Sequence, residues 1–287
     1  IDEKHRYRDL KSALNGLPDV DAVAITVPNA LHYQFASEVL KANKHLILEK
    51  PIVESWDEAV GLIKLLDSQP GVKAMVGQTL RGVPMIRLME HFLNKGIIGE
   101  IEQMTFSSHW WWVDDPKKSW RFRLPDMYLD DIGIHQFDEI RMLLNNRKCM
   151  KVMAKSWNPP SYPIPIRSSA SAIMTFENDI PVNYFASQST RGESVGWFGR
   201  VEIFGSKGEL IRDSDQHPYV ILEGSTKKIG LDDEYGEQLD ELLPMIDYEK
   251  IAYLLEDFYL AIKDNRQHIT DSHDNLTTFA ILQAVKS

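Results

Sequence analysis

The sequence predicts an α/β protein in two parts. The first part is half of a doubly wound parallel sheet, and the second is an α+β domain with a large, mostly antiparallel open sheet. Two observations support this prediction. Up to residue 78, short apolar runs alternate with segments of helical spacing, which is typical of parallel strands joined by helices. Beyond residue 78, several β-like stretches follow one another with little more than turn residues between them.

In the first part, β-branched and apolar runs predict strands over Ala22–Val27, His45–Leu48 and Ala74–Val76. Because the run Ala22–Val27 is continuously apolar, we expect that strand to be buried on both faces. Helical spacing predicts helices over Tyr7–Asn15, Ala30–Ala42 and 56–68. The third helix should begin with a capping box formed by Ser55 and Glu58.

The second part begins with a helix predicted over Pro84–Leu93. Further helices are predicted over Tyr128–Leu144, Asp247–Lys263 and Asn275–Val285. Strands are predicted over Ile101–His109, Met150–Ser156, Ser169–Phe176, Val182–Ser189, Gly199–Phe204, Glu209–Arg212 and Tyr219–Leu222. We therefore expect one domain over 1–78, a second over 79–270, and a C-terminal helix over 271–287 that packs back on the first domain.

Charge and composition exclude several classes of function. The chain has 32 Lys and Arg against 42 Asp and Glu, a net charge of −10. An acidic chain without a basic stripe is a poor partner for nucleic acid or for an anionic membrane. No apolar run is long enough to cross a bilayer. The only cysteine, Cys149, cannot form an internal disulfide, which favours a reducing, cytoplasmic location.

Polar residues follow each strand of the first part, at Val27-Pro28-Asn29, Glu49-Lys50-Pro51 and Gly77-Gln78. Open parallel sheets bind ligands at the carboxyl ends of their strands. A lysine held there can hydrogen-bond a hydroxyl and, where partly desolvated, can exchange protons. From the residues alone, a solvated strand end explains Glu49 and Lys50 equally well.

Asp131 and His135 stand four residues apart, so they would share one face of a helix. A carboxylate beside an imidazole fixes its tautomer and increases its basicity, which suits a general acid or base. Gly133 lies between them, where glycine weakens a helix unless another group approaches closely. A surface pair, or a buried structural histidine, is the simpler interpretation of this spacing.

Other sites are less well supported. No spacing among His109, Asp114, Asp131 and His135 is diagnostic of a metal site, and we expect none. The run Trp110–Trp112 could line a pocket through alternate side chains or could pack under a loop. The dinucleotide fingerprint Gly-x-Gly-x-x-Gly is absent, because no two glycines of this chain stand two residues apart.

Five segments together resemble the Gfo/Idh/MocA family of oxidoreductases. In chain order they are Val27-Pro28-Asn29 with His32, Glu49-Lys50-Pro51, Gln78–Pro84, Gly96-Ile97-Ile98-Gly99, and Asp131-x-Gly133-x-His135-x-x-Asp138. Valine replaces the threonine that this family carries in the first of them. The resemblance covers residues 10–145 by motif and continues beyond them only by architecture.

This resemblance implies a Rossmann-type domain that binds NAD or NADP, and an open-sheet domain that mediates a homo-oligomer, a dimer or tetramer. It implies oxidation of a secondary hydroxyl of a sugar, inositol or related polyol. His135 would be the general base, Asp131 would orient it or bind substrate, and Lys50 would contact the hydroxyl and the cofactor. Val27, Pro28, Asn29, His32, Glu49, Lys50 and Gln78 would lie along the cofactor. Arg81, Trp112, Lys50, Asp131 and His135 would contact substrate.

Two departures from the family pattern affect these expectations. The family carries its glycine fingerprint and a following acidic residue in its first strand-helix-strand, ahead of Ile1. We therefore expect the Rossmann-type domain to be incomplete at its N-terminus and this chain to be part of a longer one. In addition, 124–129 (LPDMYL) replaces a glycine cluster that often precedes the Asp-x-Gly-x-His helix, which changes the expected shape of the substrate pocket.

Two other functions are compatible with the same residues. One is an NAD-dependent glycoside hydrolase, which cleaves a glycosidic bond by transient oxidation. The other is a non-catalytic sensor of sugar or dinucleotide. The joint presence of Lys50, Asp131 and His135 favours an enzyme, because a sensor does not need a base.

Overall fold

The computed structural model describes residues 3–115, 119–124, 126–214, 216–230 and 250–287. The chain divides into two compact units. Unit 1 consists of Ile1–Gln78 and Leu254–Phe279, and unit 2 of Thr79–Tyr253 and Ala280–Ser287. The expected domain boundaries differ from this division near the C-terminus. The prediction placed 254–270 in the second domain and kept 271–287 together, whereas Leu254–Phe279 belongs to unit 1 and Ala280–Ser287 to unit 2.

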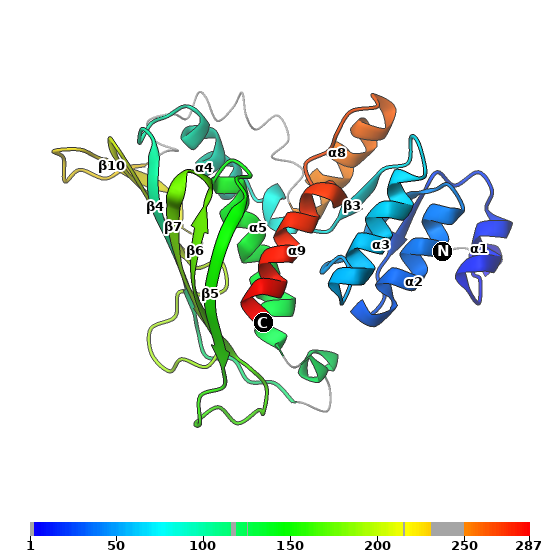
Figure 1. Ribbon diagram of the computed structural model, residues 1–287, viewed down its shortest axis with the longest axis horizontal. Coiled ribbons are helices and arrows are strands. Elements are labelled where there is room, and N and C mark those ends of the chain that lie inside the picture. Colours follow the sequence, from blue (N-terminus) through cyan, green and yellow to red (C-terminus); the bar gives the residue numbers. More distant parts are fainter. Residues whose placement is uncertain (1–2, 116–118, 125, 215, 231–249) are drawn as a thin grey trace. The chain divides into compact units, whose positions relative to one another are not determined.

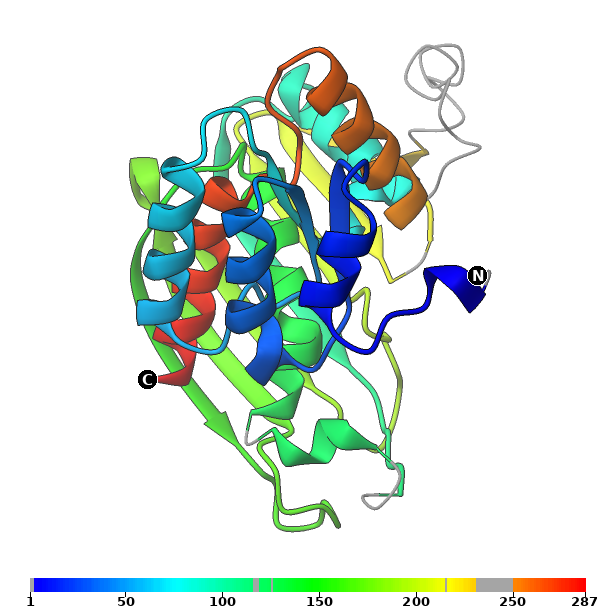
Figure 2. The same cartoon turned by 90° about the vertical axis from the view of Figure 1, so that its right-hand side faces the viewer.

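Unit 1 contains a parallel sheet of three strands in the order β1-β2-β3. The strands are β1 (Ala22–Ile25), β2 (His45–Leu48) and β3 (Ala74–Val76). The helices that alternate with them are α1 (Leu10–Gly16), α2 (His32–Lys41) and α3 (Trp56–Asp67). Figure 2 shows α2 between α1 and α3.

Local sequence explains where these helices begin and what they bury. The predicted capping box is present: Ser55 Oγ accepts from Glu58 N at 3.3 Å, and Glu58 Oε2 accepts from Ser55 N at 3.1 Å. Helix α2 buries Ala36, Val39 and Leu40. These apolar side chains share one face of the helix, which is the pattern of a helix packed against a sheet.

The prediction that the first strand is buried on both faces is wrong for the described residues. Strand β1 ends at Ile25 instead of Val27, and Ile25 is its only buried residue, while Ala24 is exposed. Strand β1 lies at the edge of the three-stranded sheet. A continuous apolar run indicates that a strand can be covered on both faces, but not which neighbours cover it.

Two C-terminal helices complete the order of elements: α8 (Ile251–Lys263) and α9 (Ser272–Lys286). Residues 247–249 of the predicted α8 region lie outside the described residues. Between these helices the chain runs along β3, where Val76 N donates to Thr270 O at 3.0 Å and Ser272 Oγ donates to Ala74 O at 2.8 Å. No helix in the described part of the chain is long and apolar enough to cross a bilayer.

Unit 2 contains an eight-stranded sheet in the order β11-β10-β9-β8-β4-β7-β6-β5. All neighbours pair antiparallel except β4 and β7, which confirms the prediction of a mostly antiparallel sheet. The strands are β4 (Ile101–His109), β5 (Cys149–Trp157), β6 (Ser169–Phe176), β7 (Ile180–Ser187), β8 (Arg200–Gly205), β9 (Gly208–Asp213), β10 (Tyr219–Leu222) and β11 (Ile229–Gly230).

Helices α4 (Pro84–Asn94) and α5 (Ile134–Leu143) lie against one face of this sheet (Figure 1). The core on that face is aromatic: the Tyr184 ring stacks on Phe106 at 5.8 Å and meets Phe137 at 4.9 Å. On β5 and β6, Met153 and Ile173 form a cross-strand pair with exposed side chains. Helices therefore cover one face of the sheet, and β5 and β6 carry an exposed apolar pair.

The segment predicted as one helix over Tyr128–Leu144 forms two elements. A π-helical turn covers Leu129–Gly133, and α5 follows from Ile134. The predicted close approach at Gly133 is present, since a Cβ there would lie 3.1 Å from Leu129 Cδ2 and 3.4 Å from the Tyr184 hydroxyl. Single π turns inside α-helices occur frequently at functional sites.

Candidate functional site

The three strand ends of unit 1 lie side by side because the strands pair in register. Leu48 is opposite both Ile25 and Val76. The pairing continues past the strands: Glu49 N donates to Ile25 O at 3.2 Å, and Gly77 N donates to Leu48 O at 2.8 Å. The polar segments that follow the strands are therefore brought to one edge of the sheet, as parallel pairing requires.

Gln78 is the most informative residue of this edge. Its side chain is 1% exposed, yet neither Oε1 nor Nε2 has a hydrogen-bond partner among the described residues. A buried amide without partners costs about 1–3 kcal/mol, so such groups are rare unless a ligand completes them. The residue thus fits a bound group that both donates and accepts hydrogen bonds.

The remaining residues of this edge differ in exposure. Asn29 is buried, Val27 and Lys50 are half-buried, and Pro28 and Glu49 are exposed. Lys50 N donates a long hydrogen bond of 3.4 Å to Glu49 Oε2. An amide, an ammonium and a carboxylate at one sheet edge can together hydrogen-bond ribose and amide groups.

His32, which the resemblance placed along the cofactor, also makes contacts within the protein. Its ring is fully buried, with Nδ1 2.8 Å from Pro51 O and Nε2 3.0 Å from Val27 O. Both ring nitrogens therefore face main-chain carbonyl oxygens, and a place for His32 along the cofactor stays a prediction. His32 ties the segment after β1 to the segment after β2 and supports the edge from beneath.

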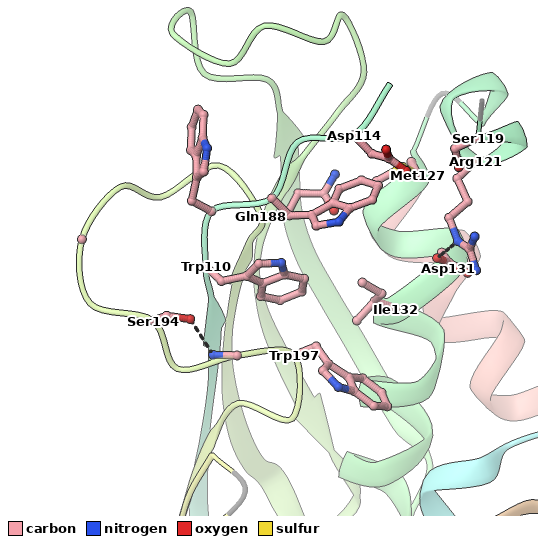
Figure 3. A pocket seen from close by; sticks show the side chains of 14 residues that line it. Trp110, Asp114, Ser119, Arg121, Met127, Asp131, Ile132, Gln188, Ser194 and Trp197 are labelled. Carbon is pink, nitrogen blue, oxygen red and sulfur yellow. Dashed lines mark hydrogen bonds and ion pairs between the residues drawn. The ribbon is translucent and has the colours of Figure 1, made fainter. Parts of the chain in front are cut away.

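Unit 2 contains a cavity of about 560 Å³ beside the π turn (Figure 3). Its aromatic lining consists of Trp110, Trp111, Trp112 and Trp197. Its polar lining consists of Asp114, Ser119, Arg121, Asp131, Gln188 and Ser194. A concave site that combines flat apolar surfaces with a few polar groups is the usual form of a small-molecule pocket.

The three consecutive tryptophans extend the pairing of β4 past its end. Trp110 N donates to Ser187 O and Trp112 N to Gln188 O, each at 3.0 Å. Trp112 stacks on Phe122 at 5.4 Å. All three tryptophans line the cavity, whereas the sequence suggested alternate ones. Trp110 and Trp197 point into the cavity toward Ile132 (Figure 3).

Hydrogen bonds from buried side chains hold the lining of the cavity in place. Gln136 Nε2 donates to Trp197 O at 2.7 Å, and the Tyr184 hydroxyl donates to Gln136 Oε1 at 2.6 Å. Burial raises the pKa of Tyr162 to about 12. Its hydroxyl donates to Trp112 O at 2.8 Å. The position of Trp197 is thus fixed from the helix side.

Asp131 lies in the π turn, on the wall of the cavity. Its Oδ2 accepts a hydrogen bond from Arg121 Nε at 2.6 Å (Figure 3). His135 is buried in the first turn of α5, and its side chain is not part of the cavity lining. Because Asp131 lies in a π turn, the four-residue spacing aligns the two side chains less closely than a regular α-helix would.

No pattern in the sequence points to Arg121. It lies in a short turn, Trp120–Arg123, ten residues before Asp131, and no helical or strand periodicity relates the two. The turn follows residues 116–118, which lie outside the described residues. Only the folded backbone brings this guanidinium to the carboxylate.

Arg81, for which the resemblance implies substrate contact, forms an ion pair within unit 2, and its contact with substrate stays a prediction. Its side chain is buried and forms a two-point ion pair with Asp138, with Nε to Oδ2 at 2.6 Å and Nη2 to Oδ1 at 2.9 Å. This buried ion pair joins the turn that carries Arg81 to α5 and stabilises their packing. The described residues contain no cluster of three or more His, Cys, Asp or Glu that could hold a metal ion.

The fold and the two sets of residues define a class: a two-unit α/β protein with a parallel sheet in one unit and an open sheet with an aromatic cavity in the other. Comparison with known proteins makes the assignment specific. Residues 3–78 match the family model described as "Oxidoreductase family, NAD-binding Rossmann fold", and residues 86–211 match the "GFO/IDH/MocA C-terminal domain". The chain belongs to the Gfo/Idh/MocA family, and its Rossmann-type and open-sheet units are those of that family.

Three similar proteins illustrate the range of this likeness. The oxidoreductase YrbE of Bacillus subtilis is 29% identical over 73% of this chain and 59% of its own length. The inositol 2-dehydrogenase of Rhizobium meliloti is 25% identical over 95% of this chain and 79% of its own. A crystal structure of an Agrobacterium radiobacter oxidoreductase with NAD⁺, L-tartaric acid and magnesium has a TM-score of 0.81 at 16% identity, covering 98% of this chain and 82% of its own. The chain thus spans about 60% of the length of some relatives.

Proposed function

We propose that this protein is an NAD(P)-dependent oxidoreductase that moves a hydride between a nicotinamide cofactor and a secondary hydroxyl of a sugar, inositol or related polyol. The observation that carries the proposal is the buried, unpartnered amide of Gln78 at the carboxyl edge of the parallel sheet. The family supports it, because the model matching residues 3–78 describes an NAD-binding fold.

The residues of the sheet edge fit a dinucleotide. The residues that would lie along it are Val27, Pro28, Asn29, His32, Glu49, Lys50 and Gln78. When bound, the nicotinamide supplies the hydride chemistry. Gln78 can hydrogen-bond the cofactor with both of its orphaned amide atoms, and that contact would remove the cost of burying them. The choice between NAD and NADP depends on residues that contact the adenosine ribose, so both belong to the proposal.

Proton transfer is the task of this chain's own residues. A carbinol loses hydride only as its hydroxyl loses a proton, so a base must receive that proton. We assign this role to His135 and assign to Lys50 a hydrogen bond to the hydroxyl oxygen. Asp131 binds a neighbouring hydroxyl or orients the base. General base catalysis contributes about 10²–10⁴-fold to such a step.

The tryptophan-lined cavity supports a substrate with a flat, partly apolar face. Sugar and cyclitol rings present C–H groups on one face and hydroxyls at the edge, and they stack on aromatic rings in this orientation. The polar lining of the cavity offers carboxylate, amide and hydroxyl partners for the edge. The relatives named inositol 2-dehydrogenase and levoglucosan dehydrogenase agree with this class of substrate.

A spectroscopic assay tests the proposal. The full natural protein is mixed with NAD⁺ or NADP⁺ and a panel of sugars and polyols, and absorbance is followed at 340 nm. We expect reduced cofactor to form in the wild type, and His135→Asn and Lys50→Met to lower kcat by about 10²-fold or more. His217→Asn, at an exposed position outside the cavity lining, is the control. Bound dinucleotide with no net reduction on any substrate would contradict the proposal.

We also propose that the enzyme works in the cytoplasm as a homo-oligomer, a dimer or tetramer formed through the open sheet. The exposed pair of Met153 and Ile173 on β5 and β6 supports the interface, because large apolar side chains on a sheet surface favour association. The single cysteine of the chain supports the location.

A further inference from the structure

The wall of the cavity contains an ion pair between two segments of different kinds. Asp131 comes from the π turn that precedes α5, and Arg121 comes from the turn Trp120–Arg123. Their Nε–Oδ2 distance is 2.6 Å, and the carboxylate is 14% exposed while the guanidinium is 43% exposed. The carboxylate end of the pair is therefore largely shielded from solvent, and the guanidinium end is exposed to it.

The turn that carries Arg121 is braced on the residues around it. Phe122 stacks on Trp112 with an interplanar angle of 16°. Phe122 and Leu124 also pack against the buried cluster of Met127, Tyr162, Ile164 and Ile166. Because its neighbours are held in this way, the backbone of Arg121 has a defined position from which its side chain reaches Asp131.

This geometry has a chemical consequence for Asp131. A carboxylate on a π turn can adopt several orientations, and a charge-assisted hydrogen bond of 2.6 Å selects one of them. A carboxylate oriented in this way can accept a hydrogen bond from a substrate hydroxyl or from an imidazole.

We propose that Arg121 is a positioning residue for the oxidation of the substrate hydroxyl: it holds the Asp131 carboxylate in one orientation on the cavity wall. The inference rests on the proposed function and adds to it a residue that acts through Asp131. Its role differs from substrate binding, because the effect of losing Arg121 should depend on the presence of Asp131.

The chain offers a matched control in a second ion pair. Arg167 Nε lies 2.6 Å from Asp126 Oδ1, with side chains 44% and 2% exposed. The arginine is therefore as exposed as Arg121, and the distance is the same. Neither Arg167 nor Asp126 lines the cavity. Loss of this pair should affect stability without affecting the chemistry.

The test compares Arg121→Ala, Arg121→Lys and Arg167→Ala in the full protein, with kcat, KM, cofactor affinity and melting temperature measured for each. Misplacing a catalytic group by about 1 Å can cost about 10²-fold, so we expect Arg121→Ala to lower kcat by about 10- to 100-fold with a smaller change in KM. Arg121→Lys should recover part of kcat, because it restores the charge but not the planar fork. Arg167→Ala should keep kcat near the wild-type value. If Arg121→Ala does not fold, Arg121→Lys carries the comparison.

A double-mutant cycle separates positioning from direct contact with substrate. In an Asp131→Asn background, Arg121→Ala should change kcat by less than about 2-fold, because its target is gone. An equal loss in both backgrounds, or a wild-type kcat in Arg121→Ala, would overturn the inference and leave the proposed function standing. A wild-type protein that reduces neither cofactor would overturn both.

Discussion

Gln78 and His32 are both buried in unit 1, but only His32 has partners for its polar side-chain atoms among the described residues. Gln78 has two orphaned polar atoms among the described residues, and His32 has both ring nitrogens engaged. A buried polar group without partners lowers stability until a ligand satisfies it, whereas a satisfied one contributes to stability throughout. The two residues should therefore respond oppositely to apolar replacement.

Gln78→Leu should leave the cofactor-free protein as stable as the wild type or more stable, because it removes a desolvated amide. The same substitution should weaken dinucleotide binding by about 10-fold, the loss of roughly one net hydrogen bond. Melting temperature and calorimetric titration measure the two effects. Gln34→Leu, at an exposed position on α2, is the control and should leave cofactor affinity unchanged. Lower stability together with unchanged affinity would contradict this assignment.

His32→Leu should destabilise unit 1 by about 1–3 kcal/mol, because the carbonyls of Val27 and Pro51 would lose their partner in a buried site. Urea unfolding of the cofactor-free protein measures the loss. An unchanged midpoint would show that the ring does not hold the two segments together.

At the scale of elements, the connection between α8 and α9 should make stability depend on pH. Burial lowers the pKa of His268, a residue of that connection, from its usual 6.5, and nearby Asp271 only partly opposes the shift. Between the folded pKa and 6.5 the unfolded chain binds more protons than the folded one, so stability rises with pH in that window.

We therefore expect the free energy of unfolding to fall as the pH is lowered from about 7 to 5, and His268→Gln to reduce that fall. His273 provides a control of opposite sign. Its pKa is raised although burial opposes the shift, because it hydrogen-bonds Asp67 and faces Asp271. Its contribution is present at low pH and is lost as the pH rises, so His273→Gln should steepen the fall. Urea titrations at the two pH values measure both variants, and an identical pH dependence in His268→Gln would contradict the assignment.

Periodicity in the sequence predicted most elements to within two residues, since strands such as His45–Leu48 and Ile101–His109 carry their own apolar pattern. It could not predict the π turn at Leu129–Gly133, where the Tyr184 hydroxyl approaches Gly133 from a distant strand. For the same reason the motifs located Asp131 and Gln78 but not Arg121, whose partner is set by a loop. Motif membership also suggested ligand contacts for His32 and Arg81. In the structure, His32 contacts two main-chain carbonyl oxygens and Arg81 forms an ion pair with Asp138.

At the scale of the whole molecule, the open sheet should control the state of assembly. Replacing Ile173 with Asp puts a charge in the middle of the exposed pair on β5 and β6, and a charge in an apolar interface is strongly unfavourable. We expect this variant to be monomeric by native mass spectrometry and the wild type to be a dimer or tetramer. Ser225→Asp, in an exposed turn, should assemble like the wild type. A monomeric wild type would contradict an interface on this sheet.

The central claim is that the carboxyl edge of unit 1 binds a nicotinamide dinucleotide for hydride transfer. Titration of the full natural protein with NAD⁺ and with NADP⁺, followed by tryptophan fluorescence or calorimetry, tests it most directly. The account predicts saturable binding of at least one of the two, weakened about 10-fold in Gln78→Leu. Absence of binding for both dinucleotides would contradict it.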